Sequence, residues 1–222
     1  LLGRIEHEWA TRKKLFDLPN ARIWQPDENV DLSFEFLGRP CATPIGPAAG
    51  PHSQLAENIV LSWLGGSRLF ELKTVQVLDE LVVQRPCIDM QTIGYNIEWS
   101  QELLVPQSLT EYVKASMLIE ILRQWEPLAE YIGSDPGPHV FDMSVGYDLA
   151  GISSDKVSSF IRGMKDASSE IEVLRSELTG SWARFTDLDF NPQISTTLTL
   201  STFHGCPPEE IESITQHLID EH

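Results

Sequence analysis

The sequence predicts an α/β fold, the N-terminal half of a TIM-type (β/α)8 barrel preceded by a short extension of helix and strand. Two observations lead to this prediction. Short, largely apolar segments alternate with amphipathic helical segments, and four such strand–helix units fit within residues 44–222. Apolar strands joined by helices are typical of a buried parallel sheet. A complete barrel needs about 250 residues. Residues 1–43 therefore form the extension and residues 44–222 a partial barrel.

The extension is predicted to contain one helix and one strand or hairpin. Residues 1–20 are partly amphipathic and favour a helix that ends near Pro19. In Asp31–Leu37 every second residue is apolar, which is the period of a strand. Gly38 then favours a turn, so an edge strand or hairpin is expected there.

The first two units of the barrel cover the region up to residue 100. PIGPAAG, at residues 44–50, is short, apolar and rich in small residues, and it stands where the first strand is expected. A helix from about Ser53 to Gly65 follows, because apolar residues recur there at helical spacing. Leu69–Val77 is the predicted second strand, and Arg85–Ser100 has the composition of a loop.

The last two units follow the same order. A long helix is predicted over about Ser108–Trp125, and the prolines at 136 and 138 prevent its continuation. Val140–Val145 is the third strand, and residues 153–182 form one or two polar helices. The fourth strand begins at Thr197 and runs into a Cys-Pro turn that starts the last helix.

Charge and cysteine usage exclude several classes of function. The net charge is −17, from 16 basic and 33 acidic side chains, which opposes binding to nucleic acid or to an anionic membrane. No apolar segment approaches the ~20 residues that span a bilayer. Three widely separated cysteines make no metal or iron–sulfur motif, so no metal site is expected within this segment. An odd number of cysteines favours a reducing, cytoplasmic location. Both ends are expected to continue into a longer chain.

Cys206 is the first candidate for chemistry. It lies at the carboxyl end of a predicted strand, the edge at which parallel α/β folds bind ligands. A thiol there can act as an acid or base, and the following helix N-terminus is expected to lower its pKa. His204 could assist. The alternative is that Cys206 is a small residue of the core.

Lys73 and Thr74 are the second candidate. A lysine in an apolar strand must place its ammonium group at the strand end to avoid a large desolvation cost. At the carboxyl edge it could face an anionic or electron-rich cofactor, and Thr74 could add a hydrogen bond. A lysine that only extends its charge to solvent is the alternative.

Small residues and an asparagine complete the candidates. Ala48, Ala49 and Gly50 have so little side-chain bulk that a flat ring system could lie against them, although close packing of a helix would use the same residues. Asn96 follows the second strand and has both a donor and an acceptor, which suits reading a substrate amide. Turn formation is the more frequent use of such an asparagine.

Taken together, the motifs are similar to those of a known family. TPIGPAAGPHSQLAENIV, FELKTVQVLDE, PCID, MSVGY and TLSTFHGCPPEEIE resemble the N-terminal part of the selenate reductase iron–sulfur subunit family, over residues from about 40 to 220. More distantly, the order of motifs resembles dihydroorotate and dihydropyrimidine dehydrogenases. The resemblance implies an FMN-binding barrel of the dihydroorotate dehydrogenase type. In the relatives, a nucleotide-binding flavoprotein region and iron–sulfur modules follow, so FAD, NAD(P)H and 4Fe-4S clusters are implied only outside this segment.

The resemblance also implies residue roles. Ala48, Ala49 and Gly50 would lie against the flavin ring, and Lys73 and Thr74 would contact its polar edge. Asn96 would bind the substrate, and Cys206 would be the active-site acid or base. This sequence has Phe203, His204 and Gly205 where the pyrimidine dehydrogenases have Asn-Leu-Ser, which disfavours a pyrimidine substrate. The phosphate-binding loops of the family would lie beyond His222.

The expected function is therefore that of a flavin-dependent, iron–sulfur-linked oxidoreductase module. It would pass electrons through FMN to or from a small-molecule substrate, with the remaining domains of the protein and other oxidoreductase subunits as partners. One alternative is a degenerate barrel that binds no flavin and serves as a docking domain for those modules. An aldolase that uses Lys73 as a Schiff-base amine is a third hypothesis. The small-residue segment and Asn96 disfavour it.

Overall fold

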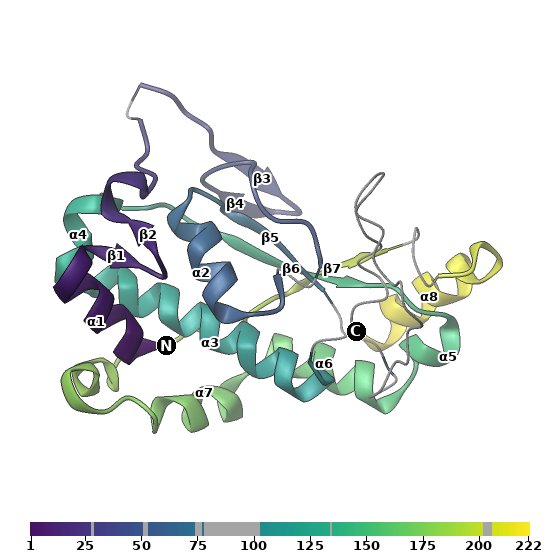
Figure 1. Ribbon diagram of the computed structural model, residues 1–222. Helices are drawn as coiled ribbons and strands as arrows, with labels where there is room; N and C mark the ends of the chain where they lie inside the picture. The colour runs from purple at the N-terminus through teal and green to yellow at the C-terminus, as the bar shows by residue number, and fades with distance from the viewer. Residues whose placement is uncertain (28, 51–52, 74–76, 78–102, 134, 202–205) are drawn as a thin grey trace, which may run out of the picture.

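A three-stranded parallel sheet forms the centre of the chain. The computed structural model describes residues 1–27, 29–50, 53–73, 77, 103–133, 135–201 and 206–222. The strands lie in the order β5 (Leu69–Lys73), β6 (Val140–Val145) and β7 (Thr197–Leu200), and their carboxyl ends point toward α5 and α8 (Figure 1). All three strands were predicted from the sequence. Of the expected second strand, residues 74–76 lie outside the described residues.

Helices cover one face of this sheet. Phe70, Leu72 and Met143 point toward them and are fully buried in the main apolar core, as the alternation of strand side chains requires. The helices of the barrel region are α2 (Ala56–Leu64), α3 (Val105–Gln124), α4 (Glu126–Ile132), α5 (Leu149–Ile152), α6 (Asp155–Lys165), α7 (Ser168–Arg175), η4 (Gly180–Phe185), η5 (Pro208–Glu210) and α8 (Ile211–Glu221). None of the helices in the described ranges is long and apolar enough to cross a membrane.

The N-terminal extension differs in part from the prediction. Helix α1 (Leu2–Arg12) ends eight residues before Asn20, and a small antiparallel pair follows, β1 (Lys14–Leu15) and β2 (Leu18–Pro19), with η1 (Asn20–Arg22) after it. Lys13, Phe16 and Asp17 all have positive φ angles, which end the helix and turn the chain back. The expected hairpin near Gly38 is confirmed: β3 (Phe34–Phe36) pairs with β4 (Arg39–Cys41), and Gly38 has a φ of 76°.

The small-residue segment lies beside the sheet without forming the strand that was expected there. The backbone N–H of Arg68 donates to the Ile45 carbonyl at 2.9 Å, and that of Glu71 donates to the Pro47 carbonyl at 3.2 Å. Gly46 makes this close approach possible, because a Cβ atom at this position would lie 1.3 Å from the Leu69 carbonyl oxygen. Residues 44–50 therefore follow the free edge of β5 and end near the carboxyl side of the sheet.

Candidate active site

The face of the sheet opposite the helices is polar. Strand register places Glu71 beside Asp142 and Asp142 beside Thr197, which makes one row across β5, β6 and β7. The next row toward the carboxyl ends contains Lys73, Ser144 and Thr199. In a closed barrel this face points inward, where bulky apolar side chains usually fill the space. Two polar rows in that position indicate a ligand site rather than a packed core.

The small-residue segment is attached to the first of these rows. The backbone N–H of Ala49 donates to Glu71 Oε2 at 2.9 Å, and the N–H of Gly50 donates to Ser53 Oγ at 3.0 Å. Gly50 is buried, Ala49 is half-buried and Ala48 is exposed. The structure thus brings the predicted small residues to the polar face, next to β5.

Lys73 is the last residue of β5, at the carboxyl end of the strand, where the sequence analysis expected it. Its side chain is half-buried, and its carbonyl oxygen accepts a hydrogen bond from the Tyr112 hydroxyl at 2.5 Å. This bond from α3 fixes the end of the strand. The other two predicted binding residues, Thr74 and Asn96, lie outside the described residues.

Asp142 is a candidate that the sequence analysis missed. Its side chain is only 3% exposed, and Oδ2 accepts a hydrogen bond from the Thr199 hydroxyl at 2.5 Å. The other oxygen, Oδ1, has no hydrogen-bond partner among the described residues. Burial raises the pKa of Asp142 above its usual value; the hydroxyls of Thr199 and Thr197 offset part of this effect, and the neighbouring Glu71 carboxylate adds to it. A single acidic residue inside the apolar strand VFDMSV was the signal that could have identified it.

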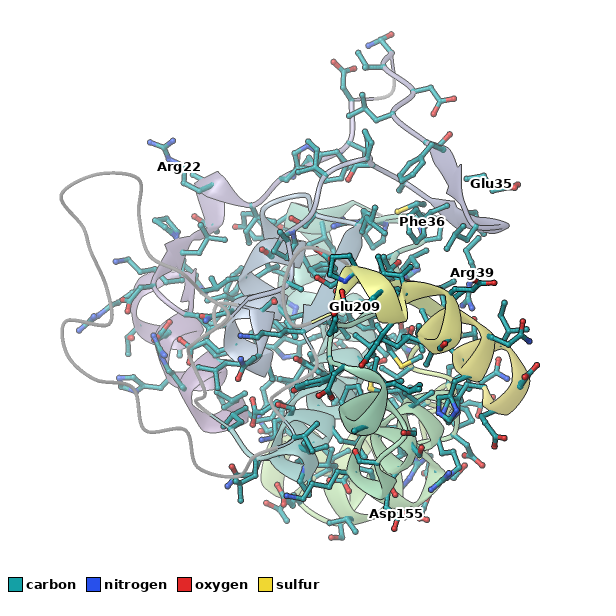
Figure 2. All side chains as sticks on the ribbon, turned by 90° about the vertical axis from the view of Figure 1, so that its right-hand side faces the viewer. Arg22, Glu35, Phe36, Arg39, Asp155 and Glu209 are labelled. Carbon is teal, nitrogen blue, oxygen red and sulfur yellow. The ribbon has the colours of Figure 1, made fainter. Side chains whose placement is uncertain are left out.

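Cys206 lies between β7 and η5, where the sequence indicated, but its thiol is buried. Its side chain is 6% exposed and belongs to the apolar core cluster. The expected decrease of its pKa is wrong: burial raises the pKa of the thiol, and the negative charge of Glu210 raises it further. Glu210 is held nearby because it accepts a hydrogen bond from the Leu149 N–H at 2.7 Å. Figure 2 looks at this end of the molecule, with Glu209 of η5 just before α8.

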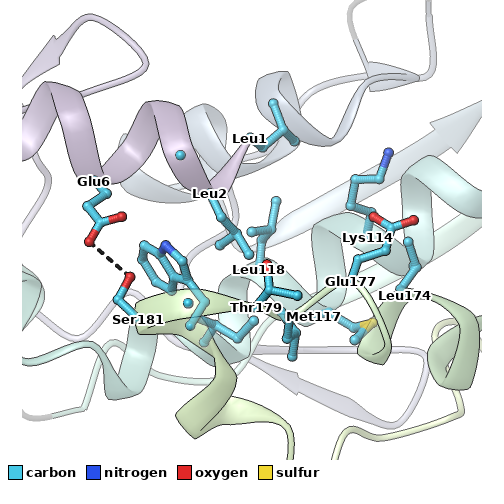
Figure 3. A pocket seen from close by; sticks show the side chains of 15 residues that line it. Leu1, Leu2, Glu6, Lys114, Met117, Leu118, Leu174, Glu177, Thr179 and Ser181 are labelled. Carbon is cyan, nitrogen blue, oxygen red and sulfur yellow. Dashed lines mark hydrogen bonds between the residues drawn. The ribbon is translucent and has the colours of Figure 1, made fainter.

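The described structure also contains a cavity of about 480 Å³ that lies away from the strand ends. It is lined by α1, α3 and the segment from α7 to η4, and the Glu6 carboxylate accepts a hydrogen bond from the Ser181 hydroxyl at its edge (Figure 3). None of the predicted site residues that the structure describes lines this cavity. In the part of the chain that the structure describes, no three side chains of the metal-ligating types gather into a metal site.

Comparison with known proteins decides the family. A model of the family described as "Oxidoreductase YgfK, N-terminal TIM-barrel domain" matches residues 16–222. The chain belongs to this family. Among its relatives are two proteins named "Putative oxidoreductase YgfK", from Escherichia coli strain K12 and from Escherichia coli O157:H7, each 39% identical over 241 residues. The alignment covers 100% of this chain and 23% of each relative, so the chain spans less than a quarter of their length.

Membership in the YgfK family relates the sheet to a barrel. The family domain is a TIM barrel, so the three parallel strands and their helices are part of a barrel wall. The polar face of β5, β6 and β7 is then the interior face, and its carboxyl end is the end at which barrel enzymes carry their active sites. The family description names this domain as the N-terminal part of an oxidoreductase.

Proposed function

We propose that this domain binds FMN on the polar face of β5, β6 and β7 and passes electrons between the flavin and a small-molecule substrate. The observation that carries the proposal is the meeting of three features on one face of the sheet: the small residues 48–50, the cation Lys73 and the buried carboxyl group of Asp142. A flat, polar ring needs room for close approach and hydrogen-bonding atoms at its edge. This arrangement offers both.

The residues present fit a flavin. Ala48 and Ala49 carry only methyl groups, so a ring could lie close to the backbone, and the Ala49–Glu71 hydrogen bond holds this segment in place. Lys73 would complement the negative charge that a flavin ring gains on reduction, which is the electron-storing chemistry that FMN supplies when bound. Asp142 Oδ1, buried and without a partner among the described residues, is the kind of polar atom that a ligand satisfies.

Cys206 is proposed as the proton donor or acceptor toward the substrate. Because the pKa of its thiol is raised, the group carries its proton at neutral pH and is suited to donate it from Sγ rather than to attack as a thiolate. Thr74 is proposed to hydrogen-bond the polar edge of the flavin beside Lys73. Asn96 is proposed to orient the substrate.

The wider protein is proposed to complete the electron path. The chain covers 23% of its relatives, so most of a YgfK-type protein lies outside this domain. We propose that those parts carry FAD, NAD(P)H and 4Fe-4S clusters and exchange electrons with the FMN site. A barrel of the dihydroorotate dehydrogenase type and an activity like that of the selenate reductase family belong to the same proposal.

The test is Lys73→Ala in the complete protein, with Lys114→Ala as the matched control. Lys114 lies on α3, where it pairs with Glu111 on the helical side of the sheet. Loss of a charge-assisted contact should weaken FMN binding about tenfold or more in Lys73→Ala and leave it unchanged in the control. Equal FMN binding by both variants and the wild type would contradict this site. A wild-type protein that binds no FMN would favour the docking-domain alternative.

A further inference from the structure

Asp142 has an environment that does not suit a carboxylate anion. It lies on the central strand of the sheet, is 3% exposed, and accepts a hydrogen bond at Oδ2 from the Thr199 hydroxyl. The Thr197 hydroxyl, on the same strand as Thr199, also favours its charged form, but burial outweighs both threonines. Its Oδ1 atom is buried and has no hydrogen-bond partner within the described ranges. A buried carboxylate normally accepts several hydrogen bonds or pairs with a cation, because desolvation of the charge is costly.

The charged groups around Asp142 reinforce this conclusion. On β5, Glu71 is its direct neighbour in the strand register, and Lys73 stands one row further toward the carboxyl end, beside Ser144. On β7 the neighbours are Thr197 and Thr199, which carry no charge. The nearest charged side chain in register is therefore another acid. Two carboxyl groups in adjacent positions do not both ionise readily.

Glu71 is held in place by the small-residue segment. Its Oε2 atom accepts the hydrogen bond from the Ala49 N–H at 2.9 Å, and its side chain is half-buried. Asp142 is the more buried of the two. Burial raises its pKa most, the hydroxyls of Thr199 and Thr197 lower it in part, and the charge of Glu71 raises it further, so the pKa lies above its usual value.

We propose that Asp142 carries a proton in the folded protein and that its Oδ1–H group donates a hydrogen bond to a neutral acceptor atom of the ring system bound on this face. This inference rests on the proposed function, since it needs a ring ligand at the site. No covalent step is involved. The proton stays on Asp142, and the residue positions and selects the ligand.

The arrangement divides the site into two regions of different chemistry. The row that contains Glu71 and Asp142 presents two carboxyl groups with Asp142 as the donor, so it accepts a neutral acceptor atom and disfavours a carboxylate or phosphate. The next row contains Lys73, which attracts the electron-rich or anionic part of a ligand. The ligand class that fits is a planar, acceptor-bearing heterocycle, with its negative charge directed toward Lys73.

The experiment compares Asp142→Asn, Asp142→Leu and the control Asp189→Asn in the complete protein. Asp189 is exposed, so the control removes the same charge from the surface. The first readout is the infrared carbonyl band of a protonated carboxyl group in flavin-free protein at neutral pH. This band should be present in the wild type and in the control and absent in Asp142→Asn. A band missing from the wild type, or unchanged in Asp142→Asn, would overturn the protonation.

The second readout is FMN affinity, measured by fluorescence titration. Asn retains a neutral donor, so Asp142→Asn should bind FMN within about threefold of the wild type, while Asp142→Leu should bind about tenfold or more weakly. Equal binding by both variants would overturn the hydrogen bond to the ring.

The pH dependence keeps the test decisive if the Leu variant does not fold. Wild-type FMN affinity should fall as rising pH removes the Asp142 proton, and the affinity of Asp142→Asn should lack this decrease. The same pH dependence in both proteins would overturn the proposal. A wild-type protein that shows the carboxyl band but binds no FMN would disprove the proposed function and the ligand half of this inference, and leave the protonation standing.

Discussion

Substitution of Gly46 by alanine should loosen the small-residue segment from the sheet. An added Cβ atom would lie 1.3 Å from the Leu69 carbonyl oxygen, far below any tolerated contact. The obstacle is the backbone of a sheet strand, so it cannot turn aside as a flexible side chain would. Residues 44–50 must instead move away from β5.

The cost can be worked out from the bonds that this movement breaks. Three backbone hydrogen bonds join the segment to β5 and the residue before it, two to the Ile45 carbonyl and one to the Pro47 carbonyl. At about 1 kcal/mol each, their loss destabilises the domain by about 3 kcal/mol. The lower chain entropy of alanine in the unfolded state offsets ~0.4–1 kcal/mol. A net loss of about 2–3 kcal/mol corresponds to a melting temperature lower by roughly 4–12 °C.

The assay is differential scanning calorimetry of the complete protein, which measures the melting temperature of the transition that includes this domain. Gly3→Ala is the matched control, because Gly3 lies in α1 and a Cβ there meets nothing within 4 Å. Gly46→Ala should also lose FMN, since Ala49 would be displaced from Glu71. If Gly46→Ala melts at the same temperature as Gly3→Ala and retains FMN, the close approach of residues 44–50 to β5 is not needed for the site.

Three further predictions follow from the structure. Burial lowers the pKa of His139 from 6.5 to about 3, so between these pH values the unfolded state binds a proton that the folded state does not. Stability should therefore fall as pH drops through this range, and His139→Phe should weaken this acid sensitivity in melting curves. Glu210→Gln should lower the Cys206 pKa and therefore speed alkylation of the thiol at fixed pH, measured by mass spectrometry. Cys206→Ser should slow flavin reduction without changing flavin content. If neither variant has an effect, Cys206 is a packing residue. Residues 1–222 alone should aggregate, because β7 has an open edge among the described residues, and a monomer that melts cooperatively would contradict the half-barrel interpretation.

The sequence predicted the elements whose signals are local. Val140–Val145 was identified to the residue because a run of mostly apolar residues is bounded by prolines before it and Gly146 after it. The pair β1–β2 was missed because its turn uses positive φ angles at Phe16 and Asp17 rather than at glycine, the residue that normally indicates such a turn.

Site chemistry that depends on distant residues could not be predicted in the same way. The pKa of Cys206 is raised by burial and by Glu210, and a bond to Leu149, 61 residues away in sequence, holds Glu210 in position. The hydrogen bond between Asp142 and Thr199 joins residues 57 apart and exists only because β6 and β7 are neighbours in the sheet. Local pattern singled out Lys73 and the small residues, and the sheet register was needed to find Asp142.

The flavin content of the complete protein tests the central claim most directly. The purified protein is denatured, and the released flavin is separated by chromatography and quantified, so that FMN from the barrel is distinguished from FAD bound elsewhere. The account predicts about one FMN per chain, with a smaller amount in Lys73→Ala and an unchanged amount in Lys114→Ala. Protein that releases no FMN, and takes up none when FMN is added, would contradict the claim that the polar face of β5, β6 and β7 is a flavin site.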